Sequence, residues 1–497
     1  MKEWLIPAGS NDRCSNPRPA PHYSNSYSFG TTMKGGMAHS YGFLSKCCFN
    51  EASISRFLFE RRIAGLFPLP SPRRRSLSLF ARGDEDSRYP SPSFDFSEYL
   101  LSGCSWKHAP SCPDFVGPLS IKLTQDCRGR GLFTSANVRA GDILLVSNPF
   151  ALSYNDPNSV HLYHMITSMT KQSSKALHQL ASLAGYCDEI IVPPMEIFDP
   201  NVPYCDFTDR QMIKYDPHRI VNTMNTNCFG GEVRLADSEP PTPLNGLWLL
   251  PSFINHSCTP NASRLFVGKA MLILASTDIE ANVEVTISYT DCFLPVHMRD
   301  EQLETLGCGF FCECQRCLLE RSLQECLFDV GEPFQAMHDE AVDEVFSLVK
   351  GKKCSRPASL HACIELFKLF GIVSKKLESS DNVTFSQKQW ILASYSYGFL
   401  GKCFAEHLSG DCTPSQWVNR RAVSLVESMK CTVPGMMRTL AFSTILAMSA
   451  KQQGSDAELI ERLHNLAMDE CIRVYGKQRQ EVTLKLMEQS LDAIPFV

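Results

Sequence analysis

The sequence predicts an α+β protein in which a β-rich domain with a helical insertion precedes an all-α C-terminal domain. Short strand-like runs separated by glycine turns recur over residues 115–306, and a helical periodicity interrupts them at 160–185. From residue 318 onward the pattern is almost entirely helical. Short strands joined by turns favour a small sheet-rich domain, whereas consecutive helices with short connections favour a helical array.

The composition is that of an ordinary globular protein. The chain has 497 residues, enough for two or three domains, with 44% hydrophobic and 20% charged residues. Its net charge of -5 gives no whole-chain argument for nucleic-acid binding. No apolar run approaches the ~18 residues that a membrane helix needs, so no membrane contact is expected.

Cysteine usage indicates a reducing compartment. The chain has 22 cysteines, but only the segment from Cys308 to Cys317 holds them densely. Secreted disulfide scaffolds are short and evenly rich in cysteine, and the N-terminus lacks the basic start, apolar core and cleavage site of a secretory signal. We therefore expect free thiols, one metal site, and a location in the nucleus, the cytoplasm or both.

Residues 1–95 differ in composition from the rest of the chain. They are rich in Ser, Pro, Gly and Arg, and residues 1–82 contain twelve Lys or Arg against four Asp or Glu. This composition predicts a disordered basic arm. Basic, acid-poor segments are also typical of organellar transit peptides, and the basic run at 72–75 resembles a weak nuclear signal, so both alternatives stay open.

The β-rich domain is predicted at 115–306. Apolar and alternating runs place its strands at 121–123, after the turn at 129–131, and at 143–146, 264–267, 271–275 and 283–289. Apolar residues between Leu162 and Leu183 recur at helical spacing inside an insertion over 151–245. Several prolines make residues 187–245 irregular in this prediction, with 240–243 as a loop.

The C-terminal domain is predicted at 321–497. Helical patterns follow one another with short connections at 341–349, 360–377, 387–407, 418–428, 436–450, 456–475 and 480–491. The absence of a strict internal period leaves individual repeats unassigned.

A Cys-x-Cys-x-x-Cys motif at Cys312, Cys314 and Cys317 has metal-ligand spacing. Thiolates bind Zn²⁺ tetrahedrally, and close spacing lets one short segment wrap a single ion. The spacing alone leaves Cys258, Cys308 and Cys326 as candidates for the fourth ligand, and ordinary free thiols as the alternative. We predict a structural zinc site in the segment 307–320.

Four motifs occur in a particular order. They are Arg-Gly-Arg-Gly-Leu-Phe at 128–133, Asn-His-Ser-Cys-Thr-Pro-Asn at 255–261, Glu-Val-Thr-Ile-Ser-Tyr at 284–289, and the cysteine motif. A buried Asn-His pair alone would be read as structural, because buried polar groups must be hydrogen-bonded wherever they occur. The ordered set of motifs is far more specific than any member.

This ordered set, spread over roughly residues 119–317, resembles the SET-domain lysine methyltransferases. The chain is most similar to the SET-and-MYND branch, because a short charged helix leads from Tyr289 to the cysteines and a helical domain follows. Residues 245–248 also resemble fungal tetratricopeptide-SET proteins. The insertion holds only Cys187, Cys205 and Cys228, so no MYND finger is expected. The resemblance implies a SET domain with insertion, a zinc-bound post-SET segment and a tetratricopeptide-like C-terminal domain.

The resemblance also implies a function and its residues. It implies S-adenosylmethionine-dependent N-methylation of a lysine on a histone or another protein, with Tyr289 as the catalytic residue. Cys258 matches the fourth ligand of a structural zinc, beside Cys312, Cys314 and Cys317. Phe311 is the alternative to Phe310 as the aromatic residue against adenine. The implied cofactor-binding residues are Arg130, Gly131, Leu132, Asn255, His256, Tyr289 and Phe310.

A rival hypothesis is a catalytically idle scaffold that retains the fold and binds protein partners through its helical C-terminal region. The size of that region motivates it. The enzyme hypothesis requires instead that the protein align nitrogen, methyl and sulfur for an in-line displacement and exclude water. A hydrophobic channel beside a sulfonium would also lower the pKa of the incoming lysine.

Overall fold

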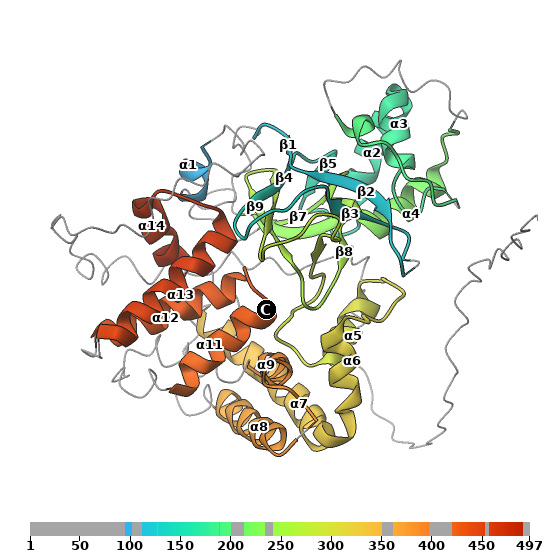
Figure 1. Ribbon diagram of the computed structural model, residues 1–497. Helices are drawn as coiled ribbons and strands as arrows, with labels where there is room; N and C mark the ends of the chain where they lie inside the picture. The colour runs from blue at the N-terminus through green and yellow to red at the C-terminus, as the bar shows by residue number, and fades with distance from the viewer. Residues whose placement is uncertain are drawn as a thin grey trace, which may run out of the picture.

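The computed structural model describes residues 95–101, 112–126, 128–187, 189–199, 213–233, 242–349, 361–380, 382–396, 420–452 and 457–490. The predicted disordered arm at 1–95 therefore lies, except for its last residue, outside the described residues. Figure 1 shows a β-rich centre, with the insertion helices on one side and the C-terminal helices on another. Together the sheets and helices confirm the α+β class.

The strands pair in four groups within the described ranges. The largest sheet is antiparallel and runs in the order β1 (Phe115–Val116), β4 (Ile143–Ser147), β10 (Ala270–Ala275) and β9 (Ala262–Val267). A second sheet has the order β5 (Ala151–Tyr154), β7 (Thr242–Leu247) and β6 (Phe229–Val233). The remaining groups are antiparallel β2 (Leu119–Leu123) with β3 (Arg130–Thr134), and parallel β8 (Asn255–His256) with β11 (Thr286–Ile287).

Strand β10 is buried along its whole length because the largest sheet is covered on both faces. Successive side chains of a strand point to opposite faces. Met271 and Ile273 join the core of the β-rich domain, whereas Leu272 and Leu274 join a second core with the C-terminal helices. A strand covered on both faces reads as a continuous apolar run, which is the pattern that predicted it.

The helical pattern at 160–185 forms two helices, α2 (Val160–Gln172) and α3 (Ser174–Ala181). Ser173 separates them, and its side chain caps α3 by accepting a hydrogen bond from the Ala176 N–H at 3.2 Å. Short 3₁₀ helices follow at η1 (Met195–Phe198) and η3 (Pro251–Phe253).

The prediction that residues 187–245 are irregular was right for 189–194 and 213–216 but wrong for most of the other residues described there. The segment contains α4 (Pro217–Asn227), strand β6 and most of β7, and Thr242 and Pro243 of the predicted loop lie in β7. Strands β6 and β7 carry glycines and a proline that local propensity disfavours, and non-local pairing of β7 with β5 and β6 overrides that preference. Gly246 cannot carry a side chain because the Trp248 ring lies 2.7 Å from where its Cβ would stand.

The helices after Tyr289 follow the predicted order. Consecutive or neighbouring helices pack together, including α7 on α8, α9 on α11 and α12 on α13. Whether they form tetratricopeptide repeats stays a prediction. The helices are α5 (Val296–Thr305), α6 (Gln315–Ser322), α7 (Gln324–Val349), α8 (His361–Glu378), α9 (Phe385–Ser394), α11 (Arg420–Thr432), α12 (Met437–Gln452), α13 (Ala457–Tyr475) and α14 (Gln480–Ser490).

The end of the helical region packs back onto the β-rich domain. Helix α13 lies against β9 and β10, and α14 lies against the short N-terminal helix α1 (Ser97–Leu101). The Arg473 guanidinium donates a hydrogen bond to the Ser276 carbonyl just after β10. Among the described helices, none has both the length and the apolar character that crossing a membrane would require.

Candidate active site and metal centre

A pocket of about 490 Å³ opens where three parts of the chain converge. One wall comes from the start of β3, a second from the insertion, and a third from the Asn-His segment and the approach to the cysteines. The residues from these walls include Arg128, Gly129, Arg130, Cys187, Glu189, Asn227, Ser252, Asn255, His256, Tyr289, Leu306, Cys308 and Phe310.

Most of the predicted cofactor-binding residues line this pocket. Five of them do so: Arg130, Asn255, His256, Tyr289 and Phe310. Phe310, rather than Phe311, belongs to the lining. Gly131 and Leu132 lie outside the lining, and Leu132 is fully buried in the core, so the pocket meets the chain at 128–130 instead of 130–132. Their part in cofactor binding stays a prediction.

Gly131 has a packing role that the sequence did not reveal. A Cβ at this position would lie 2.6 Å from Glu284 Oε1 and 3.1 Å from Asn255 Nδ2. We expected a small residue here so that the backbone could approach a ligand. The structure gives a different reason, which is that the side chains of Glu284 and the pocket residue Asn255 lie directly against the glycine.

Asn255 is oriented by its neighbours. Its Nδ2 donates hydrogen bonds to the Arg130 carbonyl at 2.9 Å and to Glu284 Oε1 at 2.7 Å. Both partners are acceptors, so the atom facing them must be the amide nitrogen, and its two hydrogens are both used. The Oδ1 atom is therefore the one that Asn255 can offer to a hydrogen-bond donor in the pocket.

Glu284 holds this arrangement in place, although its motif gave no reason to assign it a role. Its second carboxylate oxygen accepts a hydrogen bond from Arg128 at 2.6 Å. Although burial opposes the charge of Arg128, hydrogen bonding to Asp126 and the nearby charge of Glu284 raise its pKa. The Arg130 side chain instead reaches the insertion, where it donates to the carbonyls of Ser182 and Ile191.

Tyr289 is buried and lines the pocket. Its hydroxyl donates a hydrogen bond to the Ile254 carbonyl at 2.6 Å, which leaves the phenol oxygen as an acceptor. The parallel pairing of β8 with β11 brings the Asn-His segment beside the segment that ends in Tyr289.

His256 connects Tyr289 to the cysteine cluster. Its Nδ1 accepts a hydrogen bond from the Tyr289 backbone N–H at 2.9 Å, and its Nε2 lies 3.2 Å from Cys258 Sγ. Since Nδ1 is the acceptor, the neutral ring carries its hydrogen on Nε2 and donates it to the sulfur. His256 thus lines the pocket, but protein atoms engage both of its ring nitrogens.

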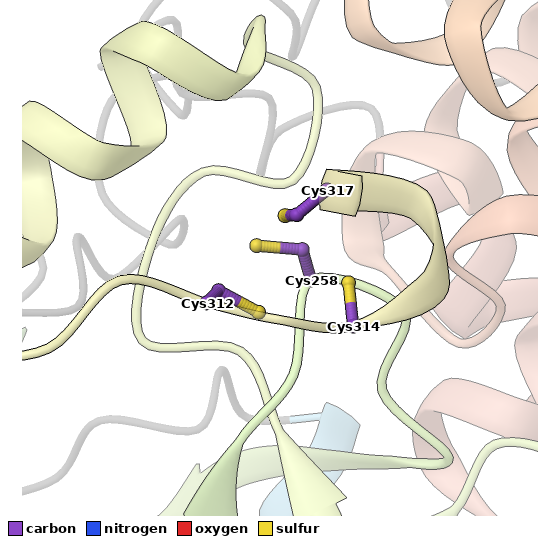
Figure 2. Close-up of side chains that lie close together, drawn as sticks. All are labelled: Cys258, Cys312, Cys314 and Cys317. Atoms are coloured by element: carbon purple, nitrogen blue, oxygen red, sulfur yellow. The ribbon is translucent and has the colours of Figure 1, made fainter. Parts of the chain in front are cut away.

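Four cysteines form a candidate metal centre. The Sγ atoms of Cys258, Cys312, Cys314 and Cys317 all lie within 4.8 Å of one another. Figure 2 shows these sulfurs converging from two segments, one after β8 and one leading into α6. Of the other candidates for the fourth ligand, Cys308 lines the pocket and Cys326 is exposed.

The donor set fits zinc. A tetrahedron with Zn–S bonds of ~2.3 Å has sulfurs ~3.8 Å apart, within the spread of these four atoms. Thiolate is the form of cysteine that binds metal ions, and four thiolates suit Zn²⁺. Cys258 and Cys317 are fully buried, Cys312 is 4% exposed and Cys314 is half-buried. Four protein sulfurs would fill a tetrahedral ion's coordination, as in structural zinc centres.

Residues 129–290 match the family model described as the SET domain. A protein of Gibberella zeae named methyltransferase is 24% identical over 250 residues, which cover 44% of this chain and 33% of that protein. The histone-lysine N-methyltransferase SMYD3 of Mus musculus is 43% identical over 72 residues, covering 14% of this chain and 17% of that protein. The protein-lysine N-trimethyltransferase SMYD5 of Gallus gallus is 35% identical over 101 residues, which cover 20% of this chain and 24% of that protein.

The chain therefore contains a SET domain at residues 129–290. The proteins that it is similar to include ones named as SMYD lysine methyltransferases and a fungal methyltransferase. In these three comparisons the chain spans a third or less of the length of the relatives that it matches.

Proposed function

We propose that this protein is an S-adenosylmethionine-dependent protein-lysine N-methyltransferase with a structural zinc ion. The observation that carries the proposal is the convergence of Tyr289, Asn255 and Phe310 on one pocket, most of whose lining belongs to the segment 129–290 that matches the SET domain. These groups suit the cofactor chemically. The Asn255 amide oxygen can accept a hydrogen bond from an ammonium group, and Phe310, which is 39% exposed at the pocket wall, offers a ring for stacking on a purine.

S-adenosylmethionine would supply an electrophilic methyl group on a sulfonium. The contribution of the chain is to orient the acceptor amine and to exclude water. The Tyr289 hydroxyl donates its hydrogen to the Ile254 carbonyl, so its oxygen can accept a hydrogen bond from the amine. This contact would stabilise the positive charge that develops on the amine nitrogen. Tyr289 belongs to the hydrophobic core of the β-rich domain, and an apolar environment favours the neutral form of a lysine, which has the lone pair that attack requires.

The substrate is proposed to be a lysine on a histone or another protein. The helical region from α7 to α14 is proposed to be tetratricopeptide-like and to bind protein partners. A nuclear or cytoplasmic location is also proposed. A peptide-array methylation screen would identify the substrate sequence, and imaging the full chain against a chain lacking residues 1–94 would test whether those residues direct its location.

Two measurements test the proposal. Radiolabelled methyl transfer to histones and to cell extract should be detected with the wild type, and it should be nearly abolished by Tyr289→Phe. Calorimetry should detect S-adenosylmethionine binding by the wild type and by the Tyr289→Phe variant. Zinc-loaded protein that binds no cofactor would favour the idle scaffold instead, and cofactor binding without transfer to any protein would contradict the enzyme proposal.

A further inference from the structure

A buried ionic cluster lies directly behind the four cysteines, and the proposed chemistry does not use it. We define this arginine cluster as Arg299 of α5, Arg316 and Glu320 of α6, and Ser394 at the end of α9. The side chains of both arginines are fully buried, Glu320 is 3% exposed and Ser394 is fully buried. Such groups are costly to bury unless their charges and hydrogen bonds are satisfied.

One side of the arginine cluster contacts two of the four metal ligands. Arg299 Nη2 donates to Cys317 Sγ at 3.3 Å. Arg316 Nη1 donates to the backbone carbonyl of Cys258 at 3.1 Å. The two ligands come from different segments of the chain, so the arginines bind both the loop after β8 and the first turn of α6.

The other side of the cluster reaches helix α9. Arg316 Nη2 donates to Ser394 Oγ at 2.6 Å, and Arg299 Nη1 donates to the same oxygen at 3.3 Å. The Ser394 hydroxyl hydrogen is donated to Glu320 Oε1. All the hydrogen-bonding capacity of this hydroxyl is thereby used. Helix α6 also packs directly against α9.

The formal charges of the arginine cluster and of the four-cysteine metal centre are complementary. Two guanidinium groups against one carboxylate leave one positive charge in excess inside the protein. Glu320 takes part in ion pairs with Arg299 at 3.0 Å and with Arg316 at 3.3 Å, so one carboxylate serves both arginines. A divalent ion with four thiolates would carry a net negative charge, and it would lie next to the guanidinium of Arg299.

We propose that the arginine cluster couples the metal centre to helix α9, so that metal occupancy and the docking of α9 stabilise each other. Such coupling is reciprocal, because each event lowers the free energy of the same folded arrangement. This inference rests on the proposed zinc ion but not on methyl transfer. Arg299, Arg316, Glu320 and Ser394 are positioning residues in this proposal.

The coupling extends to the pocket through short stretches of chain. Cys258 stands two residues after His256, and Cys312 stands two residues after Phe310. Both His256 and Phe310 line the pocket. The docking of a C-terminal helix thereby supports a pocket wall that it does not itself form.

The first experiment uses the full-length wild type and needs no variant. Hydrogen–deuterium exchange is measured with zinc bound and after removal of zinc by a chelator, with metal content determined by elemental analysis in parallel. Exchange should rise on zinc removal in peptides covering α9 as well as in those covering 312–317. Zinc loss without any change in α9 would overturn the coupling. A purified chain that neither contains nor takes up zinc would overturn both the coupling and the zinc assignment.

The second experiment compares two serines of the same chain segment. Ser394→Ala removes the hydroxyl that joins α9 to the arginine cluster. The buried Ser396 hydroxyl instead donates to the Ala393 carbonyl of its own turn at 2.8 Å, and within the described residues it makes no hydrogen bond with the arginine cluster. Chelator-driven zinc release should be faster for Ser394→Ala on the order of tenfold. Ser396→Ala should release zinc at the wild-type rate. Equal rates for the two variants would contradict the proposal.

Substitutions at Arg299 separate charge from simple packing. Arg299→Met keeps much of the side-chain length but removes the donor to Cys317 and the positive charge, so zinc release should accelerate. Arg299→Lys restores the charge and should recover part of the wild-type rate. If Arg299→Lys released zinc as fast as Arg299→Met, the contact of Arg299 with Cys317 would have only a packing role. The electrostatic part of the proposal would then fail.

Discussion

The Nδ1 atom of His256 accepts a hydrogen bond from the backbone N–H of Tyr289 at 2.9 Å. The opposite nitrogen of the same ring lies 3.2 Å from Cys258 Sγ. One imidazole therefore joins the residue proposed for catalysis to a residue proposed for metal binding. The two motifs that contain His256 and Tyr289 are brought side by side by the parallel pairing of β8 with β11.

Replacing His256 by Phe should weaken the metal centre and the pocket together. The variant loses the donor to Cys258 and leaves the buried N–H of Tyr289 without its acceptor, at a cost of about 1–3 kcal/mol in unfolding free energy. Thermal unfolding should occur at a lower temperature, and chelators should remove zinc faster. Unchanged zinc release would show that the Nε2 contact with Cys258 does not stabilise the metal centre.

Replacing Tyr289 by Phe should affect catalysis far more than stability. The lost hydrogen bond to Ile254 should lower the unfolding free energy by about 1 kcal/mol. Methyl transfer should fall on the order of a hundredfold or more, because the hydroxyl that orients the amine is gone. Cofactor affinity, measured by calorimetry, should change little.

Tyr186 provides the matched control for this experiment. It is also buried, and its hydroxyl also donates to a backbone carbonyl, that of Lys214, at 2.8 Å. The same hydroxyl accepts a hydrogen bond from the Asp216 N–H at 3.2 Å. Tyr186→Phe should therefore cost at least as much free energy of unfolding as Tyr289→Phe, without a comparable loss of methyl transfer. Equal losses of activity in both variants would mean that Tyr289 acts through stability alone.

Replacing Cys258 by Ser should lower both zinc content and cofactor affinity. A hydroxyl is a poor substitute for a thiolate ligand, and Cys258 also receives the hydrogen bond from His256. Elemental analysis and calorimetry measure the two effects. Cys308→Ser is the control for zinc content, because Cys308 lines the pocket but lies outside the four-sulfur group. A Cys258→Ser protein with normal zinc and normal cofactor affinity would refute the proposed link.

The sequence predicted the strongest local patterns and missed those that depend on distant partners. The apolar run of β10 was found because burial on both faces leaves a continuous signal. Strands β6 and β7 were missed because glycines and a proline weaken their local signal. The pairing that places β7 in the sheet comes partly from β5, where Tyr154 pairs with Leu244, 90 residues later in the chain.

The candidate site shows the same division. Spacing identified Cys312, Cys314 and Cys317, but the choice of Cys258 over Cys308 came from family resemblance, since spacing carries no three-dimensional information about a distant ligand. The role of Glu284 was not predicted. Its motif showed a carboxylate, and only the fold shows that this carboxylate lies between Arg128 and Asn255.

Replacing Gly131 by Ala should disturb the pocket through Glu284. The added methyl would stand 2.6 Å from Glu284 Oε1, so the carboxylate must move away from Asn255. Asn255 would then lose one of the two contacts that fix its orientation, and cofactor affinity should fall about tenfold. Gly371→Ala in α8 is the control, since within the described ranges no atom beyond its own helical turn lies within 4 Å of its Cβ position. Unchanged affinity in Gly131→Ala would show that Glu284 does not orient Asn255 for binding.

Glu470 should make the docking of the C-terminal helices depend on pH. It is fully buried on α13, where its carboxylate accepts a hydrogen bond from the Gly435 N–H and lies 3.3 Å from Arg473. Burial raises its pKa to about 7, against the opposing effects of Gly435, Arg473 and Lys430.

The folded protein therefore holds a proton on Glu470 over a pH range in which the unfolded chain has released it. Stability supplied by this proton is present below about pH 4.5 and is lost as pH rises toward about 7, by at most about 3 kcal/mol. Glu470→Gln stays neutral, so its unfolding free energy should fall less than that of the wild type between pH 5 and pH 7.5. Denaturant titrations at these two pH values measure the difference, and parallel changes in both proteins would show that Glu470 does not titrate in this range.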